Sequence, residues 1–260
     1  MEVIPTARTA TYTALHDRDG EMIGGVADMS VFAESNERLL HALEEAVSSA
    51  ALVVSDANLS SEAFAKLIQM SLHCRTPVFF DCTSDPKSVL PVVTNTISGI
   101  DVIKANAGEL SALVAAALRA GLFSEERRVE TALALRDPHS PGSLLTLAVA
   151  AHQLMCREGV PHPRLGKHLF VTLGARGVLW VGTGSDGRRH YASFSAAPVE
   201  PQQVRSTSGA GDCFFSAIAW GALEGMSFDI HRDNAIVMRA LRVARDSLLS
   251  RGPVPVSFSV

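Results

Sequence analysis

Two glycines and a carboxylate stand where a helix is expected to begin, since Gly209-Ala210-Gly211-Asp212 leads into the small, apolar pattern CFFSAIAWGAL. The first N–H groups of a helix have no partner within the helix and lie at the positive end of its dipole. With so little side chain at 209–211, a phosphate can approach these N–H groups closely. Asp212 would repel that phosphate, which makes sense if it removes a proton from a hydroxyl that attacks the phosphorus. The alternative is an acidic first-turn residue that only stabilises the helix dipole, and the four residues alone leave both interpretations open.

A second polar pair, Asn106 and Glu109, follows a run that predicts a strand, IDVIKAN (100–106). One interpretation is a capping box, in which Asn106 caps a helix and Glu109 reaches back to the backbone N–H of Asn106. In the other, Glu109 holds a magnesium ion through water, because Mg²⁺ keeps several waters and takes one or two carboxylates. The two interpretations are compatible.

A third group of candidate residues, Thr172, Gly174 and Gly177, belongs to the turn VTLGARG (171–177) after another predicted strand. In parallel α/β sheets, ligands bind at the carboxyl ends of the strands, where loops lead into helices. One polar residue at a strand end is usually a helix cap, but three clusters on the same rim are harder to explain in that way. The three groups therefore predict a ligand site along this rim.

The rest of the chain supplies the elements that would position these residues. Continuous apolar runs predict strands at 51–56, 77–82, 100–106, 169–174 and 177–182, and helical spacing predicts helices at 35–50, 60–73, 107–120, 143–158, 211–225 and 232–250. The run 51–56 is typical of a strand buried on both faces. This alternation predicts an α/β fold, a doubly wound, mostly parallel sheet with helices on both faces.

The first residues do not follow this alternation. Two β-prone runs, 9–17 and 21–29, are separated by Arg18-Asp19-Gly20, and an Asp-Gly between such runs indicates a hairpin. We expect residues 9–34 to form a small β lid apart from the main sheet. Residues 121–142 are polar and end with Pro and Gly, which indicates a surface insertion within one domain that spans 1–260.

Composition limits the class of protein. The chain has 260 residues, of which 47% are hydrophobic, and its net charge of -4 offers no basic surface for nucleic acid or an anionic membrane. We find no run of 18 apolar residues, so no membrane-spanning helix is expected. Four cysteines far apart in the sequence favour buried, reduced thiols and a cytoplasmic protein; they are Cys74, Cys82, Cys156 and Cys213.

Two further patterns resemble ligand sites without their context. GTGSDG (182–187) is a literal G-x-G-x-x-G, but a predicted strand, RRHYASF, follows where a dinucleotide site needs a helix. We therefore interpret it as a hairpin loop. Three scattered histidines are interpreted as surface or cap residues rather than metal ligands, namely His73, His152 and His168.

Taken together, VRSTSGAGDCF (204–214), IKANAGEL (103–110) and VTLGARGVLW (171–180) resemble the ribokinase-like, or PfkB, family of carbohydrate and nucleoside kinases. The resemblance extends from about residue 9 to the C-terminus. It implies that Asp212 is the catalytic base and that the N–H groups of Gly209, Ala210 and Gly211 form an anion hole. It further implies that Asn106 and Glu109 interact with the ATP phosphates and Mg²⁺. The nucleotide channel would be lined by Thr172, Gly174 and Gly177.

Within this family, the segment 9–34 is most similar to the lid of pseudouridine kinases, in which a D-x-x-G-x turn leads to a strand ending in Ala-Asp-Met. The resemblance implies ATP-dependent phosphorylation of pseudouridine to pseudouridine 5'-phosphate. Ribose or another nucleoside stays open as the small-molecule substrate, and so does a homodimer formed through the lid.

The sequence departs from the family pattern in two places. Ser206 stands where many members carry an Asp that helps to hold a monovalent cation, so potassium activation is not implied. Members normally open with a strand, a substrate-contacting Asp and a G-G-x-x-x-N segment, whereas this chain starts at the lid. We therefore expect an N-terminally truncated kinase domain. The alternative is a non-catalytic nucleotide-binding or assembly module that lacks the acceptor-binding segment.

Overall fold

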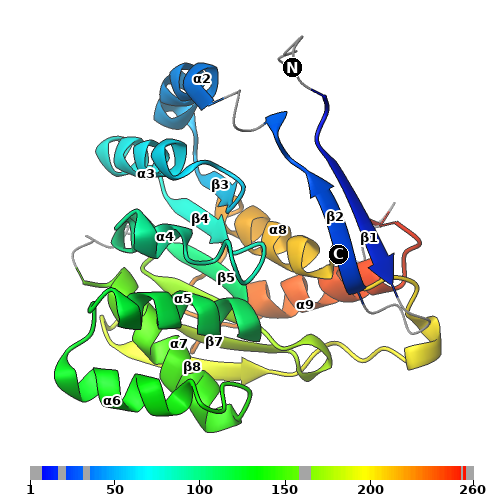
Figure 1. The fold of residues 1–260 in the computed structure, drawn as a ribbon. Coiled ribbons are helices and arrows are strands. Elements are labelled where there is room, and N and C mark those ends of the chain that lie inside the picture. The colour runs from blue at the N-terminus through cyan, green and yellow to red at the C-terminus, as the bar shows by residue number, and fades with distance from the viewer. Residues whose placement is uncertain (1–7, 17–21, 32–35, 158–164, 253, 256–260) are drawn as a thin grey trace.

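A computed structural model describes residues 8–16, 22–31, 36–157, 165–252 and 254–255. Its main layer is a six-stranded sheet in the order β3-β4-β5-β6-β7-β8, and a separate two-stranded sheet is formed by β1 and β2. Figure 1 shows helices on both faces of the main sheet and the β1–β2 hairpin beside it. The predicted α/β fold with a mostly parallel sheet and an N-terminal hairpin is confirmed.

The main sheet contains four parallel strands followed by an antiparallel hairpin. β3 (Val53–Asp56), β4 (Val78–Asp81), β5 (Val102–Asn106) and β6 (His168–Thr172) are parallel, and β7 (Val178–Thr183) and β8 (Arg189–Phe194) complete the sheet in antiparallel pairing. The GTGSDG segment (182–187) ends β7 and forms the turn to β8, so its interpretation as a hairpin loop is confirmed. The expectation that 51–56 is buried on both faces is wrong, because β3 is the last strand of the described sheet and Val54 is 56% exposed.

The sheet separates two hydrophobic cores, and neighbouring residues of one strand point to different cores. In β4, Phe80 packs with Phe64, their ring centroids 5.1 Å apart, in the core that also receives α5 and α7. The preceding Phe79 packs on the other face against Phe215 of α8, at 6.1 Å. Strands covered on both faces carry no polar alternation, which explains the continuous apolar runs in the sequence.

Seven α-helices of eight or more residues are assigned in the described ranges, together with the single turn α4 (Leu90–Val93). One face of the sheet receives α3 (Ser61–Cys74), α5 (Ala107–Arg119) and α7 (Pro141–Met155), and the other receives α8 (Ala210–Leu223) and α9 (Ala235–Leu248). α2 (Asn36–Ser49) packs on α3, and α6 (Glu125–Ala134) packs on α7. Among these helices no span is long and apolar enough to cross a membrane.

The segment 121–142 contains α6, a helix that the sequence pattern did not predict. Its residues EERRVETALA are mostly polar, and only a narrow side is buried, at Thr131 and Ala134. A narrow apolar side gives a weak periodic signal, which accounts for the omission.

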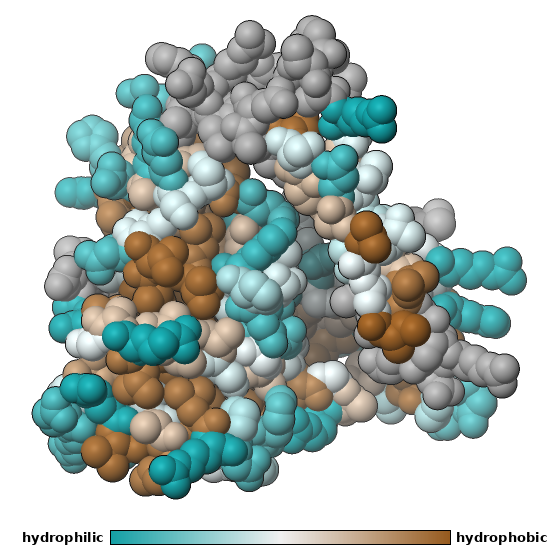
Figure 2. All heavy atoms as spheres, viewed as in Figure 1, coloured by the Kyte–Doolittle hydropathy of each residue, from teal (hydrophilic) through white to brown (hydrophobic). Residues whose placement is uncertain are grey.

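The hairpin consists of β1 (Thr11–His16) and β2 (Met22–Asp28), paired antiparallel with Thr11 opposite Asp28. The predicted Asp-Gly turn between them lies outside the described residues. Large hydrophobic side chains of this hairpin are exposed, namely Tyr12, Leu15, Ile23 and Val26. Figure 2 shows apolar side chains on the surface of the hairpin.

Two side-chain predictions are corrected by the structure. Cys82 and Cys213 are buried, but Cys74 and Cys156 are exposed, so only two of the four free thiols follow the prediction. His152 and His168 are 1% and 0% exposed, so they are core residues rather than surface or cap residues. An imidazole can be buried in this way because it has one donor and one acceptor that neighbouring groups can satisfy.

Candidate active site

The N-terminus of α8 has the open geometry expected of an anion site. Gly209 is its N-cap residue, with φ 83° and ψ -7°, a left-handed conformation that glycine adopts without strain. A glycine cap provides no side-chain hydrogen bond to the helix, and residues 209–211 are half-buried. The first N–H groups of α8 are therefore left without a side-chain cap from Gly209, at the positive end of the helix dipole.

Asp212 occupies the third position of this helix, and its side chain is exposed. Its negative charge acts on a buried cation, Lys104 of β5, which connects the helix tip to the centre of the sheet. A Cβ built at Gly211 would lie 3.3 Å from Lys104 Nζ, so the missing side chain lets the ammonium group approach the helix backbone.

Lys104 forms an ion pair with Asp81 at the end of the neighbouring strand β4. Its Nζ donates to both carboxylate oxygens of Asp81, at 2.8 Å each, and the two residues are register partners in the parallel ladder. Burial alone lowers the pKa of Lys104, but the charge of Asp81 and its hydrogen bonds outweigh burial and leave this pKa raised. The site therefore contains a permanently charged ammonium group beside the tip of α8.

The Lys104–Asp81 pair was not predicted from the sequence, although the sequence contains a signal for it. Both residues interrupt apolar runs, PVFFDC and IDVIKAN, that predict strands buried on both faces. Buried charges of this kind are rarely left unpaired. Opposite charges near the ends of two strands that are adjacent in a parallel sheet indicate a pair.

Asn106 and Glu109 form the predicted capping box at the start of α5. The N–H of Glu109 donates to Asn106 Oδ1 at 2.9 Å, and the N–H of Asn106 donates to Glu109 Oε2 at 2.8 Å. Asn106 is exposed, whereas Glu109 is only 3% exposed. The capping interpretation is confirmed, and the magnesium interpretation stays a prediction.

The carboxylates around the first turn of α5 fit a magnesium ion by their chemistry. Burial raises the pKa of Glu109, against the opposing effects of the Asn106 N–H and Lys104. The charges of Asp81 and Asp85 raise the same pKa further, which shows that several carboxylates repel one another here. The Asp85 carboxylate lies against the helix start, since a Cβ at Gly108 would be 2.7 Å from its Oδ1. A hard divalent cation would relieve this repulsion through oxygen ligands and water.

The third predicted group lies on the next strand of the same rim. Thr172 is the register partner of Asn106, and its hydroxyl donates to the Ala105 carbonyl at 3.4 Å. The turn after it has Gly174 at φ 59° and Gly177 at φ 94°. A Cβ at Gly177 would lie 1.9 Å from the Phe194 carbonyl oxygen, so this glycine is required for packing on β8, whereas Gly174 borders open space.

The predicted residues thus gather along the carboxyl edge of the parallel strands. Lys104 brings the tip of α8 close to Asp81 and to the charge of Glu109. Asn106 and Thr172 are adjacent, and Gly174 and Gly177 continue from Thr172. The arrangement offers a helix tip for an anion, a fixed positive charge, carboxylates for a cation and one exposed carboxylate that can accept a proton.

Comparisons with known proteins identify the family of the chain. A family model described as "pfkB family carbohydrate kinase" matches residues 1–235. Pseudouridine kinase of Arabidopsis thaliana is 23% identical over 274 residues, which cover 92% of this chain and 68% of that protein. Pseudouridine kinase of Escherichia coli K12 is 30% identical over 116 residues, which cover 45% of this chain and 36% of that protein.

Two solved structures illustrate the likeness in fold. Adenosine kinase from Schistosoma mansoni in complex with 2-fluoroadenosine matches with a TM-score of 0.69 at 16% identity, covering 98% of this chain and 66% of that one. Ribokinase from Arabidopsis thaliana complexed with ribose and ATP matches with a TM-score of 0.64 at 19% identity, covering 95% of this chain and 66% of that one. The fold is ribokinase-like, and the chain spans about two-thirds of the length of these structures.

Proposed function

Because the chain belongs to the pfkB family of carbohydrate kinases, we propose that it transfers the γ-phosphoryl group of ATP to a hydroxyl of a nucleoside or sugar. The observation that carries this proposal is the open N-terminus of α8, with Asp212 in its first turn and Lys104 beside Gly211. Phosphoryl transfer depends mainly on positioning and on stabilising charge, and this helix tip supplies both.

In the proposed mechanism, Asp212 accepts the proton of the attacking hydroxyl. Its exposure on the sheet rim makes the carboxylate accessible to an acceptor. The N–H groups of Gly209, Ala210 and Gly211 hold the oxygens of the transferring group through the unpaired donors of the helix start. Lys104 adds a fixed positive charge from inside the sheet, where the local dielectric makes it more effective than in water.

The nucleotide-binding part of the site is proposed to lie along the junction between β5 and α5 and the turn after β6. Asn106 and Glu109 would serve the ATP phosphates and magnesium, and magnesium when bound would neutralise charge on those phosphates. Thr172, Gly174 and Gly177 would line the nucleotide channel, with Gly174 bordering open space for the ligand.

We propose pseudouridine as the acceptor, with its product pseudouridine 5'-phosphate. Support comes from two pseudouridine kinases to which this chain is similar. The similarity to one of them covers 92% of this chain. The β1–β2 hairpin would cover the bound acceptor, and its exposed apolar side chains would become buried on closure or against the hairpin of a second copy.

A panel of nucleosides and sugars tests the proposal. Each acceptor, including pseudouridine, uridine, adenosine and ribose, is incubated with the protein, ATP and Mg²⁺, and ADP release is measured. Release with pseudouridine well above the other acceptors supports the specific proposal, and release only with another nucleoside or sugar supports the family activity but refutes this acceptor.

The same experiment, combined with a measurement of ATP binding, distinguishes the kinase from a second candidate function, a module that binds nucleotide without transferring phosphate. The observation behind it is that the chain covers only 66% of the ribokinase and 66% of the adenosine kinase to which it is similar. ATP binding measured by calorimetry, with no ADP release on any acceptor, would favour the module over the kinase.

A further inference from the structure

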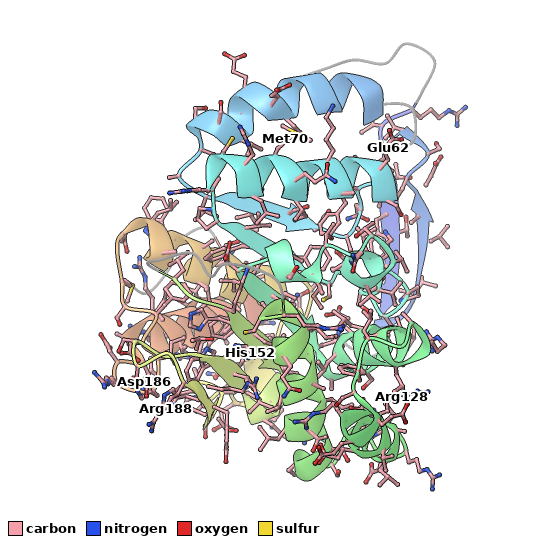
Figure 3. The ribbon with its side chains drawn as sticks, turned by 90° about the vertical axis from the view of Figure 1, so that its left-hand side faces the viewer. Glu62, Met70, Arg128, His152, Asp186 and Arg188 are labelled. Atoms are coloured by element: carbon pink, nitrogen blue, oxygen red, sulfur yellow. The ribbon has the colours of Figure 1, made fainter. Side chains whose placement is uncertain are left out.

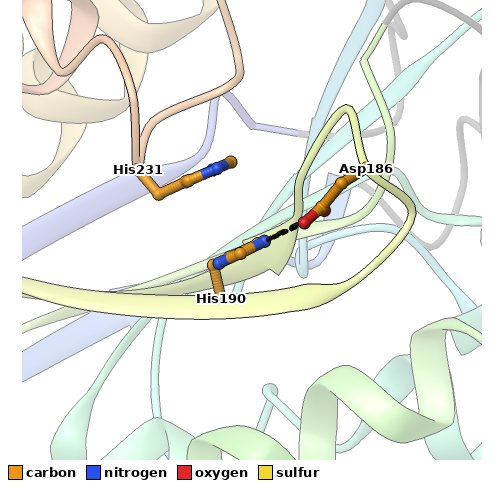
Figure 4. A group of neighbouring side chains, drawn as sticks. All are labelled: Asp186, His190 and His231. Atoms are coloured by element: carbon orange, nitrogen blue, oxygen red, sulfur yellow. Dashed lines mark hydrogen bonds and ion pairs between the residues drawn. The ribbon is translucent and has the colours of Figure 1, made fainter.

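Three side chains with metal-binding atoms converge at a place remote from the candidate active site. Potential ligand atoms of Asp186, His190 and His231 lie within 4.8 Å of one another. Asp186 belongs to the turn between β7 and β8, His190 to β8, and His231 to the connection between α8 and α9 (Figure 4). Figure 3 shows Asp186 and Arg188 on the opposite side of the view from the β1–β2 hairpin.

This cluster and Asp212 lie at opposite ends of the strands of the main sheet. β7 runs antiparallel to β6, so it ends at the edge where the parallel strands begin. α8 starts with the anion site and carries the chain to the same far edge before His231. Nothing in the proposed phosphoryl transfer uses these residues.

We propose that Asp186, His190 and His231 bind one divalent transition-metal ion of the Zn²⁺ class. Two imidazole nitrogens and one carboxylate oxygen are a donor set that suits this class rather than Mg²⁺ or Ca²⁺. His190 Nε2 lies 3.0 and 3.1 Å from the two carboxylate oxygens of Asp186. Ligand atoms about 2.0–2.1 Å from a tetrahedral zinc are about 3.3 Å apart, so this pair already has nearly the required spacing.

Asp229 lies beside His231, where a carboxylate can orient a metal-bound histidine. His231 Nδ1 lies 2.6 Å from Asp229 Oδ1, although this contact lacks the alignment of a hydrogen bond, and the hydroxyl of Ser185 donates to the other oxygen of Asp229. Once the ring has turned to bind an ion, a hydrogen bond from Nδ1–H to this carboxylate would hold the tautomer whose other nitrogen is free to bind the metal. His231 Nε2 would then complete the ligand set, and Asp186 is itself held by the N–H of Arg188 at 2.9 Å.

Binding requires one change in the ring geometry. The rings of His190 and His231 are stacked, with centroids 3.8 Å apart and planes 3° apart, whereas an ion must lie in the plane of each imidazole that binds it. His231 reaches this arrangement by rotation about its Cβ–Cγ bond, which is a soft torsion. Gly184 leaves room beside both rings, since a Cβ there would lie 2.7 Å from His231 Cε1 and 2.8 Å from His190 Cδ2. The bound ion would join the β7–β8 hairpin to the α8–α9 connection.

The test is Zn²⁺ binding to untagged protein, because a polyhistidine tag would itself bind zinc. Competition with a chromogenic chelator is expected to show one equivalent of bound Zn²⁺ in the parent. Loss of a ligand in His231→Ala should weaken binding about 100-fold or more, and Asp229→Asn, which keeps all three ligands, should weaken it about 10- to 100-fold. His139→Ala, at a histidine between α6 and α7, is the matched control and should bind like the parent.

Two further measurements guard against a folding artefact. Bound Co²⁺ should give the intense visible absorption of tetrahedral coordination in the parent and in His139→Ala but not in His231→Ala. Zn²⁺ should raise the melting temperature of the parent, while His231→Ala should melt cooperatively with or without the ion. The proposal is overturned if the parent retains no zinc, if His139→Ala and His231→Ala lose binding equally, or if Asp229→Asn binds as tightly as the parent.

Discussion

Two buried lysine–aspartate pairs lie at opposite ends of the parallel strands, and their surroundings differ. Lys104 and Asp81 lie at the carboxyl edge of the parallel strands, with their nitrogen and oxygen atoms 2.8 Å apart. Lys167 and Asp101 immediately precede β6 and β5 at the other edge, and their closest charged atoms are 3.2 Å apart. All four side chains are nearly inaccessible to solvent, so burial alone does not distinguish the pairs.

The hydrogen bonds distinguish them. Lys167 Nζ donates to the carbonyls of Ser98 and Ile100 at 2.8 Å each and to Asp101, which accounts for all three donors of an ammonium group. Asp101 in turn accepts the N–H of Val78 at 2.9 Å. Lys104 donates only to the two oxygens of Asp81 among the bonds found in the described chain, and it faces the helix tip at Gly211. A pair saturated by backbone stabilises the fold, whereas a pair beside an open helix end is suited to a ligand.

The largest effect on activity is expected from Asp212→Asn, at the carboxyl ends of the parallel strands. If Asp212 is the base, its loss should lower kcat by about 10²–10⁴-fold in the ADP-release assay, with ATP affinity nearly unchanged. Asp212 is an exposed first-turn carboxylate, so the substitution should lower the free energy of unfolding by no more than about 1 kcal/mol. Asp137→Asn, at another exposed carboxylate, is the control, and transfer by Asp212→Asn at the parental rate would show that the base is assigned wrongly.

The comparison of the two pairs is tested directly by Lys104→Met and Lys167→Met. Each leaves a buried carboxylate without its partner, so each should lose about 3–5 kcal/mol in the free energy of unfolding, measured with urea. Only Lys104→Met should also lower kcat, by about 10²–10³-fold under conditions where both variants are folded, because it removes positive charge from the transferring group.

A double variant separates the two contributions of Lys104. Asp81→Asn in the Lys104→Met background removes the unpaired charge while keeping an oxygen for the N–H of Thr83, which Asp81 accepts at 3.0 Å. Stability should recover, and activity should not. If activity recovers with stability, Lys104 has the same structural role as Lys167.

The stability of the protein should also depend on pH, because His152 and His168 are buried histidines. Arg189 Nε donates to His152 Nδ1 and Trp180 Nε1 donates to His168 Nδ1, both at 3.1 Å, so these nitrogens must stay unprotonated. Burial lowers the pKa of each histidine from 6.5 to about 4.

Below pH 6.5 the unfolded chain binds protons at these two positions, whereas the folded protein does not bind them until the pH reaches about 4. The free energy of unfolding should therefore fall as the pH decreases from 6.5 to 4, by about 1.4 kcal/mol per pH unit for each histidine. Urea unfolding at pH 7.5, 6 and 5 measures this. A His152→Gln variant should show a shallower decrease, and equal stability of the parent at pH 7.5 and 5 would contradict the assignment.

The sequence predicted the parallel sheet, the capping box and the rim of candidate residues because these have local signals. The apolar runs, the Asn106–Glu109 spacing and the Gly-Ala-Gly tip can each be recognised within a few residues. The Lys104–Asp81 pair depends on strand register, and the burial of His152 depends on packing against Lys167 and Arg189. Such contacts join residues far apart in the chain, so composition and periodicity did not show them.

The smallest expected effect distinguishes a helix cap from a cap that also serves a ligand. Asn106 Oδ1 accepts the N–H of Glu109 at 2.9 Å, and Ser60 Oγ accepts the N–H of Ala63 at 3.2 Å at the start of α3. Asn106→Ala and Ser60→Ala should each cost about 1 kcal/mol of stability in urea unfolding, since each removes one cap.

Only Asn106→Ala should raise the KM for ATP, because it also releases the backbone that positions Glu109. Ser60→Ala serves as the matched control for the general loss of stability. If the two variants keep the same KM, the Asn106–Glu109 motif acts only as a cap, and the nucleotide site must be sought elsewhere along the rim, beginning with the open turn at Gly174.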